Sequence, residues 1–150
     1  VIIGILATVS LFAFNSAYDI IKLEGAYRQL MKDIRYVQQL SIARQQYHGI
    51  YFYGTGNGYW AYRQAIGSSS RETVIDPATC KQLSVSFGVV GEPGTIMVST
   101  SYGIPGGVRF DSLGTPGSAE SGTPSGGTVT LTYKGSTKTI TIEANTGRIQ

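Results

Sequence analysis

The feature that most constrains this chain is an apolar run at its start, residues 1–14, which carries no charged side chain. Nine of these fourteen residues are large and apolar: Val1, Ile2, Ile3, Ile5, Leu6, Val9, Leu11, Phe12 and Phe14. Burying one such side chain is worth roughly 1.5–3 kcal/mol, so leaving the run in water would forgo on the order of 20 kcal/mol. The run therefore needs a lipid bilayer or other protein around it, and we interpret it as a membrane or filament-core helix.

The run by itself is short for a membrane span. Fourteen helical residues reach about 21 Å, whereas the hydrocarbon core of a bilayer is about 30 Å thick. The chain also begins with Val1, and neither a basic segment nor the small-residue cleavage site of a signal peptide is visible. We therefore expect further apolar residues before Val1, which would bring the segment to bilayer length.

A one-sided apolar stripe follows the run, spaced 3, 4, 3, 4 and 3 residues apart as on one face of a helix. Its members are Ile20, Leu23, Tyr27, Leu30, Ile34 and Val37. The pattern predicts one helix over residues 1–48, apolar on all faces over about 1–18 and amphipathic over about 19–48. We expect the stripe to pack on a head domain, residues 49–150; a short coiled coil is the alternative.

From Gly49 onward the period changes from helical to β. Residues 50–53 and 59–63, on either side of a glycine-rich turn, predict a hairpin, and residues 128–133 and 137–142 predict another. Shorter strands are expected at 73–75, 84–90, 95–99 and 108–111. Twelve of the fourteen residues from 114 to 127 are Gly, Pro, Ser or Thr, so we expect an exposed, mobile loop there. The chain is thus predicted to have an α+β fold, with about seven mainly antiparallel strands in the head.

Composition and motifs argue against an enzyme. Only 14% of the residues are charged, and the net charge of +3 is a weak hint of anionic partners. Cys80 is the single cysteine, so no intrachain disulfide can form, and His48 is the single histidine. A Cys80–His48 pair has no supporting motif, and no nucleophile elbow, metal loop or phosphate loop occurs. We expect no catalytic residue, no metal ligand and no cofactor.

A long helix with an apolar start, followed by a β-rich head, resembles bacterial type IV pilins and the pseudopilins of type II secretion. Residues 2–7, Ile-Ile-Gly-Ile-Leu-Ala, resemble the end of the prepilin N-terminal segment. Residues 30–44, 108–114 and 140–149 resemble, in that order, the helix end, the internal strand and turn, and the Thr-Gly-Arg ending of the GspH/FimT subgroup. The family's leader peptide and early glutamate are not in this sequence. Ser10, Leu11 and Phe12 stand near the place where many pilins have a proline.

The resemblance implies a head of two packed sheets on the C-terminal half of the helix, and prepilin-type N-terminal methylation. It also implies a structural subunit held in the bacterial inner membrane by a single pass, with its head outside the cytoplasm. The subunit would then pack with copies of itself or with sibling pilins in a periplasmic pseudopilus or a cell-surface pilus. A minor subunit is favoured, and a major pilin is the alternative.

A third interpretation is DNA binding. Some FimT-like proteins take part in DNA uptake, with basic residues near a C-terminal Gly-Arg. Gly147 and Arg148 match that pattern here, whereas Gln150 stands where a second arginine would be expected. Lys134 and Lys138 lie nearby in sequence and could add contacts to phosphates. Solvated charges on a hairpin are the simpler explanation of the same residues.

Overall fold

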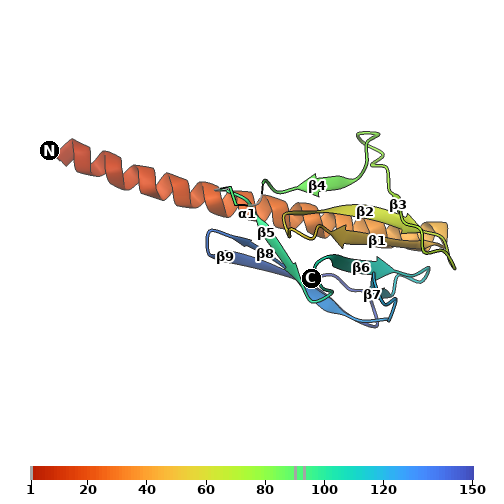
Figure 1. Cartoon of the computed structure of the whole chain (residues 1–150). Helices are drawn as coiled ribbons and strands as arrows, with labels where there is room; N and C mark the ends of the chain where they lie inside the picture. Colours follow the sequence, from red (N-terminus) through yellow and green to blue (C-terminus); the bar gives the residue numbers. More distant parts are fainter. Residues whose placement is uncertain (1, 90, 93) are drawn as a thin grey trace.

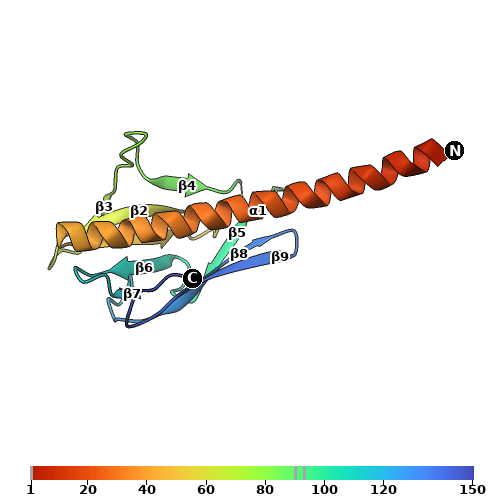
Figure 2. The ribbon, with the colours of Figure 1, turned by 180° about the vertical axis from the view of Figure 1, so that it is seen from behind.

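The computed structural model describes the backbone of residues 2–89, 91–92 and 94–150, and the side chains of residues 17–89, 91–92 and 94–150. This part of the chain contains one helix and nine strands (Figure 1). The helix, α1 (Ile2–Arg44), extends beyond the head at its N-terminal end, and its C-terminal half lies against the strands (Figures 1 and 2). Val1 and the side chains of the run at 1–14 lie outside the described residues.

Helix α1 ends earlier than the sequence predicts. Its last residue is Arg44, whereas the prediction placed the end at His48. Gln45 has a positive φ of 52°, and the Gln46 N–H donates back to the Ser41 carbonyl at 3.4 Å. Strand β1 (Tyr47–Phe52) then begins at once, so His48 belongs to a strand. The prediction was wrong because it extended the helix up to Gly49. Residues 47 and 48 belong instead to strand β1, which pairs with the next strand.

The larger sheet has six antiparallel strands in the order β3-β2-β1-β6-β7, and β4 pairs with β2 beside β3. Strand β1 is flanked by β2 (Gly58–Gln64) and β6 (Gly106–Phe110). The outer strands are short: β3 (Glu72–Thr73), β4 (Ser84–Ser86) and β7 (Pro116–Ser118). The first predicted hairpin is confirmed, with Phe52 opposite Tyr59 next to the turn.

The smaller sheet has three antiparallel strands in the order β5-β8-β9: β5 (Met97–Thr100), β8 (Gly127–Tyr133) and β9 (Ser136–Ile142). The second predicted hairpin is confirmed as β8–β9, with Tyr133 opposite Ser136 at the turn. The last residue, Gln150, exchanges both backbone hydrogen bonds with Thr141 of β9, at 2.7 and 3.0 Å. The nine strands exceed the seven or so expected, because the additional ones are too short to give a period-2 pattern.

One hydrophobic core lies between α1 and the two sheets. The helix contacts β1 and β6 of the larger sheet and β8 and β9 of the smaller one. Strand alternation supplies the inward side chains, which are fully buried: Ile50, Phe52, Tyr59, Ala61, Val108, Phe110, Val129, Leu131 and Ile140. The two-sheet head expected from the resemblance is therefore present.

The glycine- and serine-rich segment at 114–127 is only in part the exposed loop that its composition predicts. Residues 116–118 form β7, in which Gly117 pairs with Arg109 of β6. Ala119 is buried, and its N–H donates to the Gly107 carbonyl at 2.8 Å. The expectation is wrong for residues 116–119, because backbone hydrogen bonds to β6, rather than apolar side chains of the segment itself, order this edge of the sheet. Residues 120, 121, 123 and 124 are exposed, as expected.

Candidate functional site

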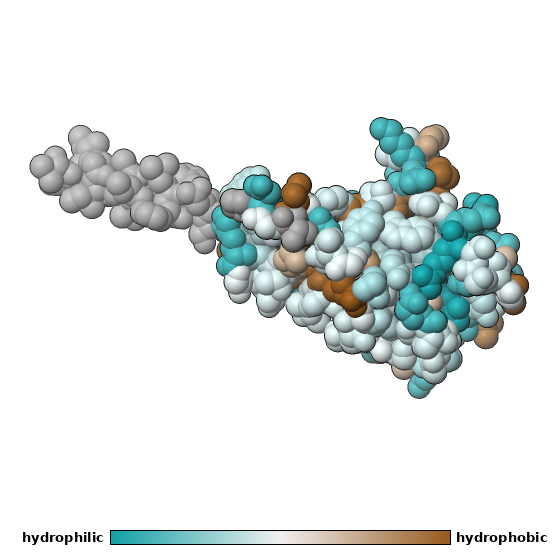
Figure 3. Space-filling view, in the orientation of Figure 1, coloured by the Kyte–Doolittle hydropathy of each residue, from teal (hydrophilic) through white to brown (hydrophobic). Residues whose placement is uncertain are grey.

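The place where α1 leaves the head carries exposed apolar side chains. Tyr18 is 66% exposed and Ile21 is 69% exposed. Large apolar exposure thus continues past residue 18, where the sequence pattern placed the end of the all-round apolar part. On the face shown in Figure 3, hydrophobic residues occur as small patches between hydrophilic ones. Among the described residues, therefore, nothing covers most of the Tyr18 and Ile21 side chains at the base of the helix.

The predicted helix-to-head stripe divides into a buried part and an exposed end. Four of its members are almost completely buried: Leu23, Leu30, Ile34 and Val37. Tyr27 is half-buried against the core. Ile20 is 58% exposed, so its predicted packing on the head is wrong. The buried face of α1 is centred on Leu23, Ala26 and Leu30, which leaves Ile20 at its edge.

Two ion pairs join α1 to the β8–β9 hairpin. Lys134 Nζ lies 2.9 Å from Asp19 Oδ2, and this hydrogen bond raises the pKa of Lys134. Lys138 Nζ lies 3.1 Å from Glu24 Oε2, and Arg28 Nε lies 2.7 Å from the other oxygen of Glu24. The hydrogen bonds from Arg28 and Lys138 lower the pKa of Glu24. Such exposed pairs contribute little stability, but they fix where the hairpin tip meets the helix.

The three stretches that carried the family resemblance meet at Gln38 of α1. Its side-chain amide nitrogen donates to the Gly114 carbonyl at 3.0 Å and to the Gly147 carbonyl at 3.0 Å. Gly147 has a φ of 63°, and a Cβ there would collide with the Gln38 amide. The Gln38 side chain thus holds the turn after β6 and the last turn against the helix, although these two turns are far apart in the sequence.

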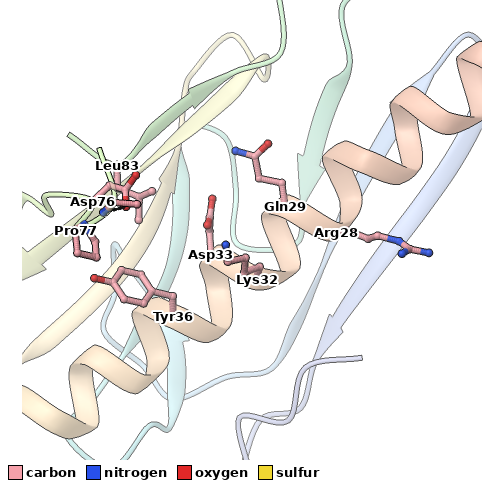
Figure 4. A pocket seen from close by; sticks show the side chains of 9 residues that line it. Arg28, Gln29, Lys32, Asp33, Tyr36, Asp76, Pro77 and Leu83 are labelled. Atoms are coloured by element: carbon pink, nitrogen blue, oxygen red, sulfur yellow. Dashed lines mark hydrogen bonds between the residues drawn. The ribbon is translucent and has the colours of Figure 1, made fainter. Parts of the chain in front are cut away.

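A groove of about 540 Å³ lies between α1 and the segment that joins β3 to β4. It is lined by Arg28, Gln29, Lys32, Asp33, Tyr36, Asp76, Pro77, Ala78 and Leu83. In Figure 4 the Asp33 carboxylate points from the helix toward Asp76 and Leu83, and the Tyr36 ring lies beside Pro77. Asp33 is only 8% exposed, so the groove has an acidic group at its floor.

The Asp33 carboxylate has one hydrogen-bond donor among the described residues. The Tyr59 hydroxyl donates to Asp33 Oδ2 at 2.7 Å. Burial raises the pKa of Asp33, and this effect exceeds the opposing influence of the Tyr59 hydrogen bond and the Lys32 charge. Burial and the adjacent Asp33 charge also raise the pKa of the Tyr59 hydroxyl. Keeping the ionised form of this carboxylate buried therefore costs free energy.

The fold of this chain is similar to that of solved protein structures. No family model and no curated protein matches the sequence. The type IV minor pilin FimU of Pseudomonas aeruginosa matches with a TM-score of 0.57 at 16% identity, over 85% of this chain and 86% of that chain. The minor pseudopilin EpsH from the Type 2 Secretion System of Vibrio cholerae matches with a TM-score of 0.63 at 10% identity, over 86% and 94%. The chain has the pilin fold. The predicted α+β, pilin-like fold class is confirmed.

The pilin fold keeps the one histidine and the one cysteine in different environments. His48 is fully buried on β1, and its Nδ1 lies 3.2 Å from the Gln46 carbonyl oxygen. Burial lowers the pKa of His48, so the imidazole is neutral at physiological pH. Cys80 is exposed on the segment between β3 and β4. No hydrogen bond joins the two among the described residues. The solved structures that share this fold are named as a minor pilin and a minor pseudopilin.

The three basic residues considered for DNA binding do not lie together on the pilin head. Lys134 and Lys138 pair with acids of α1 at one end of the hairpin. Arg148 lies at the other end, where its carbonyl accepts from the Glu143 N–H at 3.0 Å. Lys138 precedes Glu143 by five residues, about 17 Å of strand, and Lys134 lies farther away, in the turn at the opposite end of β9. The structure therefore offers no shared basic patch made of these three side chains.

Replacing Arg148 with alanine should leave DNA binding almost unchanged. One exposed arginine, separated along β9 from both lysines by about 17 Å or more, neutralises at most one phosphate by itself. We expect gel shifts with double-stranded DNA to give apparent Kd values within about twofold for wild type and Arg148→Ala at each salt concentration. A tenfold loss of affinity, with a flatter salt dependence, would instead establish Arg148 as a DNA contact.

Replacing Asp33 with asparagine should stabilise the pilin head at neutral pH. Because burial raises the pKa of folded Asp33 above the ordinary value of 3.8, ionisation opposes folding. This penalty is absent below that value and grows as the pH rises through the raised folded pKa. Asparagine keeps an acceptor for the Tyr59 hydroxyl without the charge. Thermal midpoints of wild type and Asp33→Asn in detergent should therefore diverge between acidic and neutral pH, with the variant higher at neutral pH.

Asp76 on the opposite wall of the groove provides a control of the other sign. It accepts hydrogen bonds from the Ala78 N–H at 3.0 Å and the Thr79 hydroxyl at 2.8 Å, which lower its pKa. Asp76→Asn should therefore lower the thermal midpoint at neutral pH. Equal midpoints for wild type and Asp33→Asn at every pH would show that the Asp33 carboxylate carries no penalty.

Sequence reasoning missed Asp33, Tyr59 and Gln38. Asp33 lies between Leu30 and Val37 on the buried face of α1, so its helix position was the available signal. A charged residue at such a position is ordinarily assigned to the solvated side, which hid it. Nothing local distinguishes Gln38 from its exposed neighbour Gln39, because its partners are backbone carbonyls more than seventy residues away.

Proposed function

We propose that this chain is a structural subunit of a type IV pilus-like or pseudopilus-like filament, assembled through its apolar N-terminal helix. The observation that carries the proposal is the projecting helix itself. Its first part reads as apolar on all sides in the sequence, and it extends beyond the head in Figures 1 and 2. At its base, Tyr18, Ile20 and Ile21 remain exposed.

The physical basis of assembly is an exchange of one apolar environment for another. A bilayer and a bundle of neighbouring helices can both bury a helix that is apolar on all sides. Extraction from lipid is therefore offset by burial among sister subunits, so no large net free energy is needed. We propose that the helix is anchored in the inner membrane before assembly, with the head outside the cytoplasm. None of the described helical residues forms a stretch that meets the length and hydropathy expected of a membrane span.

A minor subunit is the form of this proposal that we favour. The FimU and EpsH structures, which share the pilin fold, are named as a minor pilin and a minor pseudopilin. Sequence stretches similar to the GspH/FimT subgroup point the same way, and they meet at Gln38. If the role is minor, the chain should be scarce relative to the main subunit in sheared filaments. If it is the dominant protein of those filaments, the major-pilin alternative replaces it.

Cysteine cross-linking within the apolar run tests the proposal. Val9→Cys and Phe12→Cys would be introduced together into a Cys80→Ser background, so that no other thiol is present. We expect oxidation of assembled filaments to link neighbouring subunits through these positions. The matched control places a cysteine at Ser136, an exposed residue at the start of β9, which should not link through the filament core. Assembled filaments in which the run never cross-links would exclude a packed helical core.

A further inference from the structure

The face of the larger sheet that turns away from α1 carries a row of aromatic rings. Side chains alternate along a strand, so the residues next to the inward-pointing ones of β1 and β2 lie on this outer face. They include Tyr51, Tyr53, Trp60 and Tyr62. The ring centroids of Tyr51 and Trp60 are 5.9 Å apart, and those of Trp60 and Tyr62 are 5.7 Å apart. Aromatic side chains thus run across the outer face from one strand to the other.

Arg71 covers one end of this aromatic row. Its guanidinium carbon lies 4.8 Å from the centroid of the Tyr51 ring and 5.2 Å from the centroid of the Tyr62 ring. The guanidinium also donates to the Ala119 carbonyl at 2.8 Å, which holds it in place. Tyr62 is fully buried beneath it. The chain itself therefore supplies a planar, hydrogen-bonded group that stacks on these two rings.

The other end of the row is open. Tyr53 and Trp60 are half-buried, and a pocket of about 260 Å³ lies beside them. Thr73 of β3, Gln82 and Ser84 of β4 complete its lining. These residues come together because β3 and β4 pair with neighbouring parts of the same strand, β2 (Figure 1). We call this the Trp60 pocket.

The polar groups of the Trp60 pocket are uncharged. Its five side chains offer an indole N–H, a phenol, two hydroxyls and an amide, and none of these carries a charge at neutral pH. Among the described residues, no side-chain hydrogen bond occupies any of these groups. A ligand in the pocket would therefore meet aromatic rings together with groups that donate and accept hydrogen bonds.

We propose that the Trp60 pocket binds one ring of a neutral saccharide. A pyranose ring has an apolar C–H face, which packs on an aromatic ring, and hydroxyl groups around its edge, which match amide and hydroxyl side chains. The pocket is slightly smaller than the roughly 300 Å³ at which pockets for drug-sized ligands begin, so it suits a single sugar ring. Nucleic-acid bases also stack on aromatic rings, but among the described residues no cation lines the pocket to meet their phosphates.

Fluorescence tests the proposal directly, because Trp60 is the single tryptophan of the chain. The full chain would be titrated with chitotriose, maltotriose and cellotriose in a zwitterionic detergent, since detergents with sugar headgroups would compete. We expect at least one trisaccharide to change the intensity and wavelength of Trp60 emission, with a Kd of about 1 mM for a single half-enclosed ring. No change with any of the three at about 20 mM would overturn the proposal.

Two substitutions locate the bound sugar while keeping the fluorescent residue. Gln82→Ala removes an exposed amide, so the Kd should rise at least about threefold with an unchanged thermal midpoint. Tyr53→Leu removes the second ring of the pocket, so the Kd should rise at least about fivefold. Gln39→Ala, at an exposed position on α1, is the matched control and should bind like wild type. Equal affinities for all four proteins would place the sugar elsewhere and overturn the Trp60 pocket as its site.

The same assay distinguishes a saccharide from single-stranded nucleic acid. Oligodeoxythymidylate should give no saturable change of Trp60 emission at physiological salt. If it bound more tightly than every trisaccharide, with an affinity that falls as salt rises, nucleic acid would replace the saccharide as the ligand. All of these titrations use the unassembled subunit, so their failure would leave the proposed filament function unaffected.

Discussion

Gly107→Ala is expected to prevent the head from folding. Gly107 lies on β6 opposite Tyr51 of β1, in the centre of the larger sheet. A Cβ at this position would overlap the Ile50 carbonyl oxygen, which belongs to the backbone of β1. Because no rotamer change can move a backbone atom, the two central strands would have to separate. We expect a loss of more than about 4 kcal/mol, which is comparable to the whole stability of many domains.

The measurement is thermal unfolding of the full chain in detergent, followed by near-ultraviolet circular dichroism of the buried aromatic residues. Gly107→Ala should show no cooperative transition. Gly54→Ala is the matched control, because its nearest neighbours, atoms of Pro105, are 3.8 and 3.9 Å from the added Cβ. It should unfold within about 0.5 kcal/mol of wild type. A cooperative transition for Gly107→Ala near the wild-type midpoint would mean that β1 and β6 are not packed as described.

The fold was predictable from sequence wherever the pattern is local. Strand alternation in residues 128–133 and 137–142 gives the β8–β9 hairpin, and the stripe from Leu23 to Val37 gives the buried face of α1. Strand β7 was not predictable in this way. Its residues, Pro116–Ser118, have low strand propensity, and they are ordered by pairing with β6. Strand pairing also explains why the helix ends earlier than predicted, because Tyr47 pairs with Gln64 across the β1–β2 hairpin.

The candidate site, like the fold, was predictable from the sequence only in part. The apolar run and the need to cover it follow from composition alone, since hydrophobic burial requires no detailed geometry. The groove along α1 depends on which segment crosses the helix, and that is set by the connection between β3 and β4.

Gln38→Ala is expected to be the most damaging change at an incompletely buried side chain of α1. The substitution leaves the Gly114 and Gly147 carbonyls without the donor that now lies 3.0 Å from each. Each unsatisfied carbonyl costs about 1–3 kcal/mol, so a total loss of about 2–4 kcal/mol is expected, reduced where water reaches them. The damage should also be local. Both turns should gain backbone hydrogen exchange, while the β1–β2 hairpin keeps its protection.

Gln39→Ala is the control for that experiment, because Gln39 is the adjacent residue, has the same chemistry and is exposed. It should leave the free energy of unfolding within about 0.5 kcal/mol of wild type. The hydrogen exchange of the two turns should also be unchanged. Gln38 joins the helix to the last turn, whose tail in turn pairs with β9 through Thr141 and Gln150. Loss of Gln38 should therefore also weaken the pairing of Gln150 with Thr141 and expose that edge of β9. If Gln38→Ala and Gln39→Ala behaved alike, the Gln38 amide would not be what holds the turn after β6 and the last turn against the helix.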